Sequence, residues 1–209
     1  TWTDVENLVF HTRYQIQGEP LDHTMGIWRA AIDTGGGRNR DDDWSKTEEI
    51  YEWVRKNGRG VVFPTKGASR PQIRKVNPNV IDKMTRGNRV IPGGLVLYFL
   101  DTDKFKELFH WRLSRTPEES QHITLNTDTD LVYARQILAE QKQKDKKGNV
   151  AWVPIRRDNH LLDCEIYAAA CADPEWTPSL SCLLAKAPPP TNKKTKKPSP
   201  FTDGRSLMG

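Results

Sequence analysis

The sequence predicts an α/β fold built from strand–helix–strand units. Three apolar runs have the composition of strands, at residues 27–32, 60–65 and 95–100. Helices with an apolar face are predicted at residues 45–56, between the first two runs, and at residues 104–113, after the third. Because parallel strands are joined through a crossover, often a helix, we expect the first two strands to pair in parallel.

The composition is that of one basic domain with a tail. The chain has 209 residues, 32 of them Lys or Arg and 27 Asp or Glu, with a net charge of +5. Such a charge suits a phosphate-rich partner, and it suits a merely soluble basic domain equally well. We place a folded domain at residues 1–185 and a flexible tail at residues 186–209, which is too rich in lysine and proline to fold alone.

Two further bounds come from composition. No apolar run approaches the ~18 residues that cross a bilayer, so no membrane contact is expected. The three cysteines, Cys164, Cys171 and Cys182, lack zinc-type spacing and are expected to be reduced, as in a cytosolic protein. Since the first residue is Thr rather than Met, the chain is expected to be a fragment.

Asp33 is the first candidate functional residue. Helical periodicity predicts a helix over residues 1–17, with Thr3 and Glu6 as its capping box. The strand at residues 27–32 then runs into Asp33, and three glycines follow. An aspartate in this place either begins a turn, as it commonly does before glycine, or presents its carboxylate beside open space.

The loop after the second strand carries two candidate phosphate contacts. The helix at residues 45–56 has Ser45 as its expected N-cap and is followed by the strand at residues 60–65. Lys66 and Arg70 come next, where ligands of parallel sheets commonly gather. An ordinary basic loop explains them nearly as well.

The central part of the chain contains the most strand-like run. Residues 95–100 are continuous enough for a strand buried on both faces. Asp101 and Asp103 are expected mainly as caps of the helix at residues 104–113, with metal contact as the lesser alternative. Residues 72–88 are basic and interrupted by a proline, and no element is predicted there.

The pattern of the last third of the chain predicts two helices and a strand. After a short extended piece at residues 122–125, a helix is predicted over residues 131–143 and a strand over residues 150–155. Arg156 and Arg157 follow this strand and are further candidates for phosphate contact.

The final helix carries the second candidate acid. It is predicted to begin at Asp158 or Asn159 and to run to Ala170, with one apolar stripe facing inward. Asp163 lies about one turn from its start, where the helix N-terminus stabilises a carboxylate. His160 is expected to be structural.

Asp33 and Asp163 together suggest a site for divalent metal. No Ser-His-Asp order, nucleophile elbow or HExxH motif is present. In two-metal phosphodiester hydrolysis, carboxylates hold two Mg²⁺ or Mn²⁺ ions roughly 3.5–4 Å apart. One ion activates water, and the other stabilises the leaving oxygen.

Four blocks of the sequence occur in a recognisable order: AIDTGG, EEIYEWV, VVFPTKG and NHLLDCEIYAAACA. Together they resemble the nuclease domain of the lambda-type large terminase subunit of tailed bacteriophages. The segment LYFLDTDKFKELFHWRL resembles that family's strand and following Lys-bearing helix, in which Lys104 is a candidate DNA contact. The resemblance covers roughly residues 2–173. It implies an RNase H-like fold, with a mixed central sheet flanked by helices and an acidic cluster that binds two divalent ions.

The resemblance also implies residue roles. By position, Asp33 resembles the acid at the end of the family's fourth strand, and Asp163 the acid on the final helix. Lys66 matches the family's Lys-Gly and is expected to contact phosphate. The family's first metal-binding Asp lies on a strand upstream of the first helix here, so the opening strands are expected to be missing. The ATPase motor is expected to be missing too, because no Walker motif is present.

The leading hypothesis is therefore a two-metal endodeoxyribonuclease that uses Mg²⁺ or Mn²⁺ to cut double-stranded viral DNA concatemers during genome packaging in the host cytoplasm. The terminase small subunit and the portal protein are the implied partners. The alternatives are a catalytically inactive DNA- or portal-binding remnant, or another RNase H-like nuclease such as a resolvase or transposase.

Overall fold

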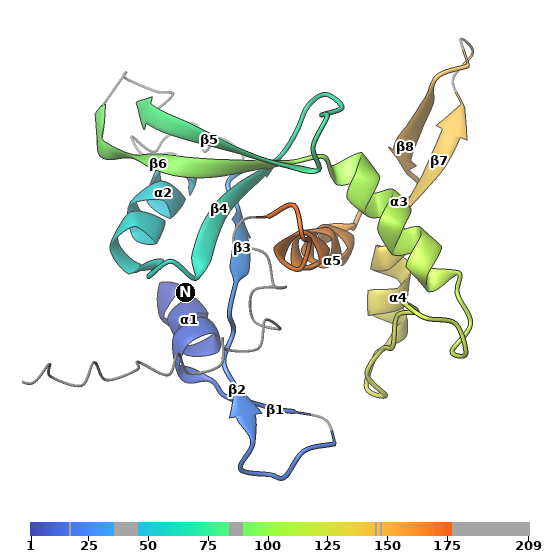
Figure 1. Ribbon diagram of the computed structural model, residues 1–209. Helices are drawn as coiled ribbons and strands as arrows, with labels where there is room; N and C mark the ends of the chain where they lie inside the picture. Colours follow the sequence, from blue (N-terminus) through green and yellow to red (C-terminus); the bar gives the residue numbers. More distant parts are fainter. Residues whose placement is uncertain (17, 36–45, 84–89, 145, 147, 177–209) are drawn as a thin grey trace, which may run out of the picture.

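The computed structural model describes residues 1–16, 18–35, 46–83, 90–144, 146 and 148–176 (Figure 1). The predicted tail lies outside this part of the chain, as do Cys182, the last two of the three glycines after Asp33, and Ser45, the predicted N-cap of the second helix. Across the described ranges, no helix is both long enough and apolar enough to cross a membrane.

The central sheet has four strands in the order β3, β4, β6, β5. Their bounds are Ala30–Asp33 for β3, Val62–Gly67 for β4, Val76–Lys83 for β5 and Val90–Leu100 for β6. β3 pairs in parallel with β4, and β4 with β6, whereas β5 is antiparallel to β6. The predicted parallel pairing is confirmed, as is a mixed sheet flanked by helices. Within the described sheet, β3 is an edge strand.

Helices cover both faces of this sheet (Figure 1). α2, Lys46–Asn57, packs on one face, and its Trp53 and Val54 join a buried cluster with Val62 and Leu97. α5, His160–Cys171, packs on the other face together with α3, Thr102–Leu113. The second cluster contains these fully buried side chains: Leu100, Phe105, Leu162, Ile166, Ala170 and Trp176.

The alternation of side chains along β3 decides which face its acid occupies. Ala30 and Ile32 contact the α2 cluster, and Ala31 contacts the α5 cluster. Successive side chains of a strand point to opposite faces, so Asp33 lies on the α5 face. The strand therefore directs its last residue toward the helix that carries Asp163.

The N-terminal helix is shorter than predicted. α1 covers Trp2–Glu6, its capping box is Thr1 with Asp4, and a π-helical turn continues it over Asn7–His11. The chain then forms β1, Tyr14–Gln15, which pairs with β2, Thr24–Met25. The expected helix to residue 17 is wrong because Arg13 bonds to Thr24 and the Tyr14 hydroxyl donates to Leu8 O, which favours this hairpin over further helical turns.

Two segments in the middle of the chain also differ from expectation. β5 occupies residues for which no element was predicted, and Pro78 is tolerated there because β5 is an edge strand. Residues 122–125 form no strand. The expectation that Asp101 caps α3 is confirmed, because its side chain accepts a hydrogen bond from Lys104 N at 3.3 Å.

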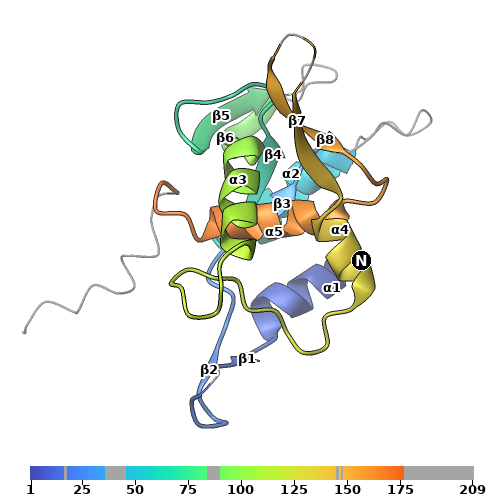
Figure 2. The same cartoon turned by 90° about the vertical axis from the view of Figure 1, so that its right-hand side faces the viewer.

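The predicted helix over residues 131–143 is right only in its first half. α4 covers Leu131–Ile137, and the chain then forms β7, Glu140–Lys144, which pairs antiparallel with β8, Val150–Pro154. The helix ends early because Ala139 O accepts hydrogen bonds from the backbone N–H groups of Ile155 and Arg156. Figure 2 shows the resulting hairpin projecting from the body beside α3.

The packing of α5 generates a stability prediction. Ile166→Ala is expected to lower the free energy of unfolding by about 2–5 kcal/mol, because Ile166 is fully buried between the helix and the sheet. Val132→Ala on α4, where the side chain is 57% exposed, is the control and should change it by less than about 0.5 kcal/mol. Urea denaturation followed by circular dichroism measures both. Equal effects at the two positions would contradict this assignment of the core.

Candidate acidic site between β3 and α5

A cavity of about 550 Å³ lies between β3 and one face of α5. One wall is continuous backbone and side chain from Ala30 to Asp33, preceded by Ile27 and Arg29. The other wall is a single helix face, formed by these residues: His160, Asp163, Cys164, Tyr167, Ala168 and Cys171. Both acids predicted from the sequence therefore line the same cavity.

Asp33 is held at the end of β3 by local hydrogen bonds. Its Oδ1 accepts from the backbone N–H of Gly35 at 2.9 Å and from the Tyr167 hydroxyl at 3.0 Å. A Cβ at position 35 would lie 3.1 Å from Oδ1, so glycine permits this close turn. Thr34 anchors the turn because its hydroxyl and its backbone N–H both donate to Thr65 O. The Asp33 side chain is thus oriented while the residue stays exposed.

Asp163 lies in the first turn of α5, where its N–H donates to Asn159 O at 3.2 Å. Burial raises the pKa of this carboxyl group, Lys106 opposes the rise, and the negative charges of Glu140 and Asp33 add to it. The charge of Asp33 is thus close enough to act on the Asp163 carboxyl group across the cavity that both residues line.

A buried ion pair beside Asp163 was not predicted from the sequence. Lys106 Nζ on α3 lies 2.7 Å from Glu140 Oε2, and both side chains are almost fully buried. The other carboxylate oxygen of Glu140 accepts from Asn159 Nδ2 at 2.9 Å. This network joins the start of β7 to the N-cap residue of α5. No local sequence pattern indicates it, because the three residues lie far apart along the chain.

Tyr167 is a further residue of the cavity that was not predicted from the sequence. Burial and the neighbouring Asp33 raise the pKa of its hydroxyl, so it donates to that carboxylate as a neutral phenol. It follows Asp163 by four positions, which places both on one helix face. That spacing was the available signal. His160, expected to be structural, also lines the cavity and is exposed.

The five predicted phosphate contacts lie outside the lining of this cavity. Phe63 packs toward the α5 cluster, so strand alternation puts Lys66 on the opposite, α2 face of the sheet. Arg70 is exposed in the loop between β4 and β5, and Arg157 is exposed ahead of α5.

The other two cations are engaged in holding the fold. Lys104 Nζ donates to Gln72 O and Ile73 O and lies 3.5 Å from Asp101, which fixes the loop ahead of β5. Arg156 Nη1 donates to Leu138 O at 2.7 Å at the C-terminal end of α4. Lys104 Nζ and Arg156 Nη1 thus donate to backbone carbonyls.

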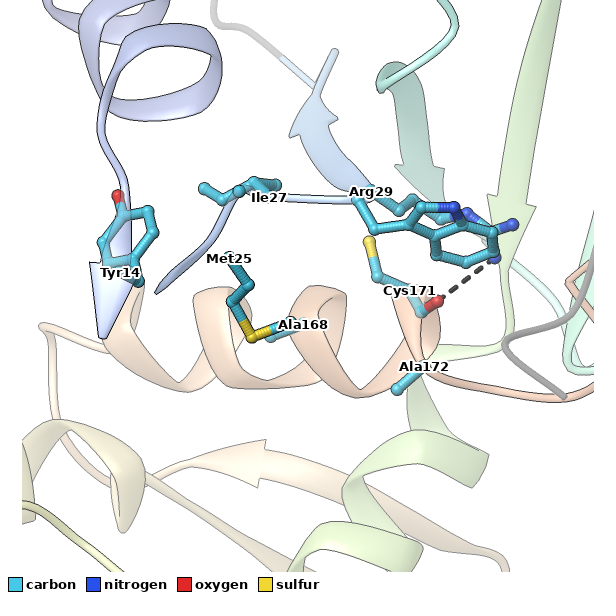
Figure 3. Close-up of a pocket in the computed structure, with 9 residues that line it drawn as sticks. Tyr14, Met25, Ile27, Arg29, Ala168, Cys171 and Ala172 are labelled. Atoms are coloured by element: carbon cyan, nitrogen blue, oxygen red, sulfur yellow. Dashed lines mark hydrogen bonds between the residues drawn. The ribbon is translucent and has the colours of Figure 1, made fainter. Parts of the chain in front are cut away.

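A smaller apolar cavity of about 330 Å³ continues the groove along α5 (Figure 3). It shares Ile27, Arg29, Ala168 and Cys171 with the acidic cavity and extends to Tyr14. Arg29 Nη1 donates to Cys171 O at 3.1 Å, which ties the end of α5 to the segment before β3. Cys164 and Cys171 are free thiols, and burial raises the pKa of Cys171 to about 11.

The oxygen ligands that Asp33 and Asp163 offer are suited to a hard divalent cation, but they are few. Carboxylate oxygens are the ligands that Mg²⁺ prefers, and Mg²⁺ is commonly held by one or two carboxylates with water and phosphate completing its shell. Among the described residues, no three His, Cys, Asp or Glu side chains are grouped closely enough to hold a metal ion. Asp33 and Asp163 thus form a pair of candidate ligands rather than a complete protein cage.

Comparison with known proteins agrees with the resemblance in the sequence. The family described as the endonuclease domain of terminase large subunit gpA matches residues 1–175. The chain is 31% identical over 198 residues to the terminase large subunit of Escherichia phage lambda, covering 88% of this chain and 28% of that protein. It is 27% identical over 187 residues to the terminase large subunit of Enterobacteria phage P21, covering 83% of this chain and 27% of that protein.

The chain therefore spans little more than a quarter of the length of these relatives. No solved structure matches it. The family match extends over most of the chain and includes both acids of the cavity between β3 and α5. The chain belongs to the family of terminase large subunit gpA endonuclease domains.

Proposed function

We propose that the chain is a metal-dependent endonuclease domain that cuts double-stranded DNA, with Asp33 and Asp163 as its metal ligands. The observation that carries the proposal is that these two carboxylates, from opposite ends of the described chain, line one cavity. Membership of the gpA endonuclease-domain family supports the reaction class.

The residues present fit Mg²⁺ or Mn²⁺, because both acids offer hard oxygen ligands in a cavity open to a phosphate group. Two bound ions would supply an activated water and neutralise the leaving oxygen. Tyr167 and the Gly35 N–H hold Asp33 Oδ1, which leaves Oδ2 for a ligand. Lys106, paired with Glu140, places positive charge beside Asp163 and favours its ionised form.

A further oxygen ligand is needed to complete an acidic cluster. We propose that this ligand is a further acid of the cluster that the resemblance implies, in an RNase H-like fold.

The biological setting is proposed from the family alone. The DNA would be viral concatemers cut during genome packaging in the cytoplasm of the host. The terminase small subunit and the portal protein would be the partners. The family name supports DNA packaging in general terms.

The first test is cleavage by variants of the two acids. Asp33→Asn and Asp163→Asn are each expected to reduce plasmid nicking in Mn²⁺ by about a hundredfold or more, because each removes a ligand worth several kcal/mol of charge stabilisation. Asp103→Asn, an exposed acid on α3, is the control and should cut like the parent.

Equal nicking by all four proteins would reject the assignment of these acids. An inactive parent that still binds DNA would support the non-catalytic remnant instead.

The second test concerns the Tyr167 hydroxyl. Tyr167→Phe is expected to raise the Mn²⁺ concentration for half-maximal nicking by about tenfold, because hydrogen bonds to metal-binding carboxylates orient them. Tyr133→Phe is the matched control, since the Tyr133 hydroxyl on α4 donates at 2.6 Å to Glu165, which lies on α5 as Tyr167 does. An unchanged Mn²⁺ requirement in Tyr167→Phe would show that this bond does not position Asp33.

The third test is the stability of the metal-free protein. Because the pKa of Asp163 is raised in the folded state, its contribution to stability is lost as the pH rises through that pKa. Asp163→Asn, which cannot ionise, is therefore expected to unfold at a higher temperature than the parent near neutral pH. The difference should shrink as the pH falls below the ordinary aspartate pKa of about 3.9.

Thermal unfolding in a chelator measures this difference, with exposed Asp158→Asn as the control. A lower melting temperature for Asp163→Asn at neutral pH would contradict the burial of an ionised acid.

A further inference from the structure

The hairpin of β7 and β8 carries a concentrated positive charge. Residues 141–157, which include most of the hairpin and the two arginines after it, contain six basic side chains and one acidic side chain. Their net charge of +5 equals that of the whole chain, so the remaining residues together are neutral. We propose that this hairpin is a binding surface for the phosphate backbone of duplex DNA. This inference rests on the proposed function, which supplies DNA as the substrate.

The base of the hairpin is fixed to α3 by three contacts on one face. Lys106 pairs with Glu140, the His110 ring stacks on Trp152 with centroids 4.7 Å apart, and Lys142 Nζ lies 2.6 Å from Glu107 Oε1. Glu140, Lys142 and Trp152 share this face because Lys142 is directly opposite Trp152 in the ladder. An isolated two-stranded hairpin is marginally stable, so these contacts are what hold it in a defined direction.

The outer half of the hairpin faces solvent. Lys144, at the end of β7, and Lys146, in the turn, are exposed, and so is Val150 opposite Lys144. Lys144 lies about 14 Å along the strand from Glu140, at ~3.4 Å per residue. Figure 2 shows this part standing clear of the helices. Exposed lysines on a fixed projection are suited to phosphates, because they make sequence-independent contacts that position a protein on DNA.

The hairpin begins beside the acidic cavity. Glu140 bonds to Asn159, the residue before His160, which lines that cavity. A duplex whose scissile phosphate entered the cavity would therefore pass the base of the hairpin, and its neighbouring phosphates would come within reach of Lys144 and Lys146. Lys142 is partly neutralised by Glu107, so the inference rests on the outer lysines.

The competing explanation is that these lysines only prevent edge-to-edge association of the hairpin, as charged residues on exposed strands commonly do. An acidic protein partner is the other alternative. Both predict that duplex DNA binding does not depend on these lysines, and binding measurements therefore separate the three explanations.

The experiment measures binding of the full chain to a fluorescent duplex by anisotropy, in chelator so that no cleavage occurs. Lys144→Gln with Lys146→Gln is expected to weaken binding roughly tenfold or more at 0.1 M salt. The slope of log K against log salt should fall by about 2, because each phosphate contact contributes about 0.9. The control pair is Lys56→Gln with Lys83→Gln. Both lysines are exposed, Lys56 near the end of α2 and Lys83 at the end of β5. Figure 1 shows α2 and the arrowhead of β5 on the side of the molecule away from the hairpin.

A second measurement needs no substitution. In the parent protein, bound duplex is expected to protect Lys144 and Lys146 from acetylation, read by mass spectrometry, while Lys56 and Lys83 stay reactive. Lys144→Arg with Lys146→Arg should bind DNA like the parent, because charge is retained.

Several results would overturn the inference. The first is that the parent does not bind DNA, and the second is that both glutamine pairs lose the same amount of DNA affinity. The third is a salt slope that is the same in the Lys144 and Lys146 variant as in the parent. The fourth is that Lys144 and Lys146 are acetylated equally with and without DNA. If the parent binds through the hairpin but does not cut, the inference holds and the proposed nuclease function fails. If it cuts while the Lys144 and Lys146 variant binds and cuts normally, the proposed function holds and the inference fails.

Discussion

The packing of α5 against the sheet is the constraint on which the rest of the structure depends. Leu162, Ile166 and Ala170 are fully buried on one side of the helix, and this seats the helix against the sheet beside β3. The neighbouring helix face then carries Asp163 and Tyr167 to the cavity at which β3 ends. A rotation of the helix that removed the buried stripe from the core would also separate Asp163 from Asp33.

The Lys106–Glu140 pair connects this packing to the hairpin. A buried ion pair gains little net stability, since desolvation of both charges offsets their attraction. Its placement is informative for another reason, because Glu140 begins β7, Asn159 precedes α5, and Lys106 lies on α3. One polar network thus sets the relation between the acid on α5 and the basic hairpin. In the proposed function, this network would fix the position of the hairpin that contacts the DNA backbone relative to the acid that binds metal.

Much of the fold could be predicted from the sequence where the signal was local. The strands at β3, β4 and β6, the helix α5 with its apolar stripe and the Asp101 cap all follow from periodicity and capping residues. Asp33 and Asp163 were selected because each acid stands at a regular position, a strand end and a first helical turn. Their positions suggested that the two acids could meet, and the resemblance to a known family strengthened that expectation.

The features that the sequence did not predict depend on distant partners. β5 exists because its backbone pairs with β6, and β7 exists because β8 and Lys106 favour a strand where periodicity favoured continued helix. The contacts of Lys104 and Arg156 were likewise not predicted, because the backbone carbonyls that accept from them lie elsewhere in the fold. Charge counted along the sequence does not distinguish such lysines and arginines from those that remain exposed, such as Lys144.

The proposed function requires that the carboxylates of Asp33 and Asp163 together hold a divalent cation. A crystal of the protein soaked in Mn²⁺, with anomalous scattering recorded at the manganese edge, would show whether they do. We expect an anomalous peak in the cavity between β3 and α5, within about 2–2.5 Å of an oxygen of each carboxylate. A manganese peak bound elsewhere, with this cavity empty, would contradict it.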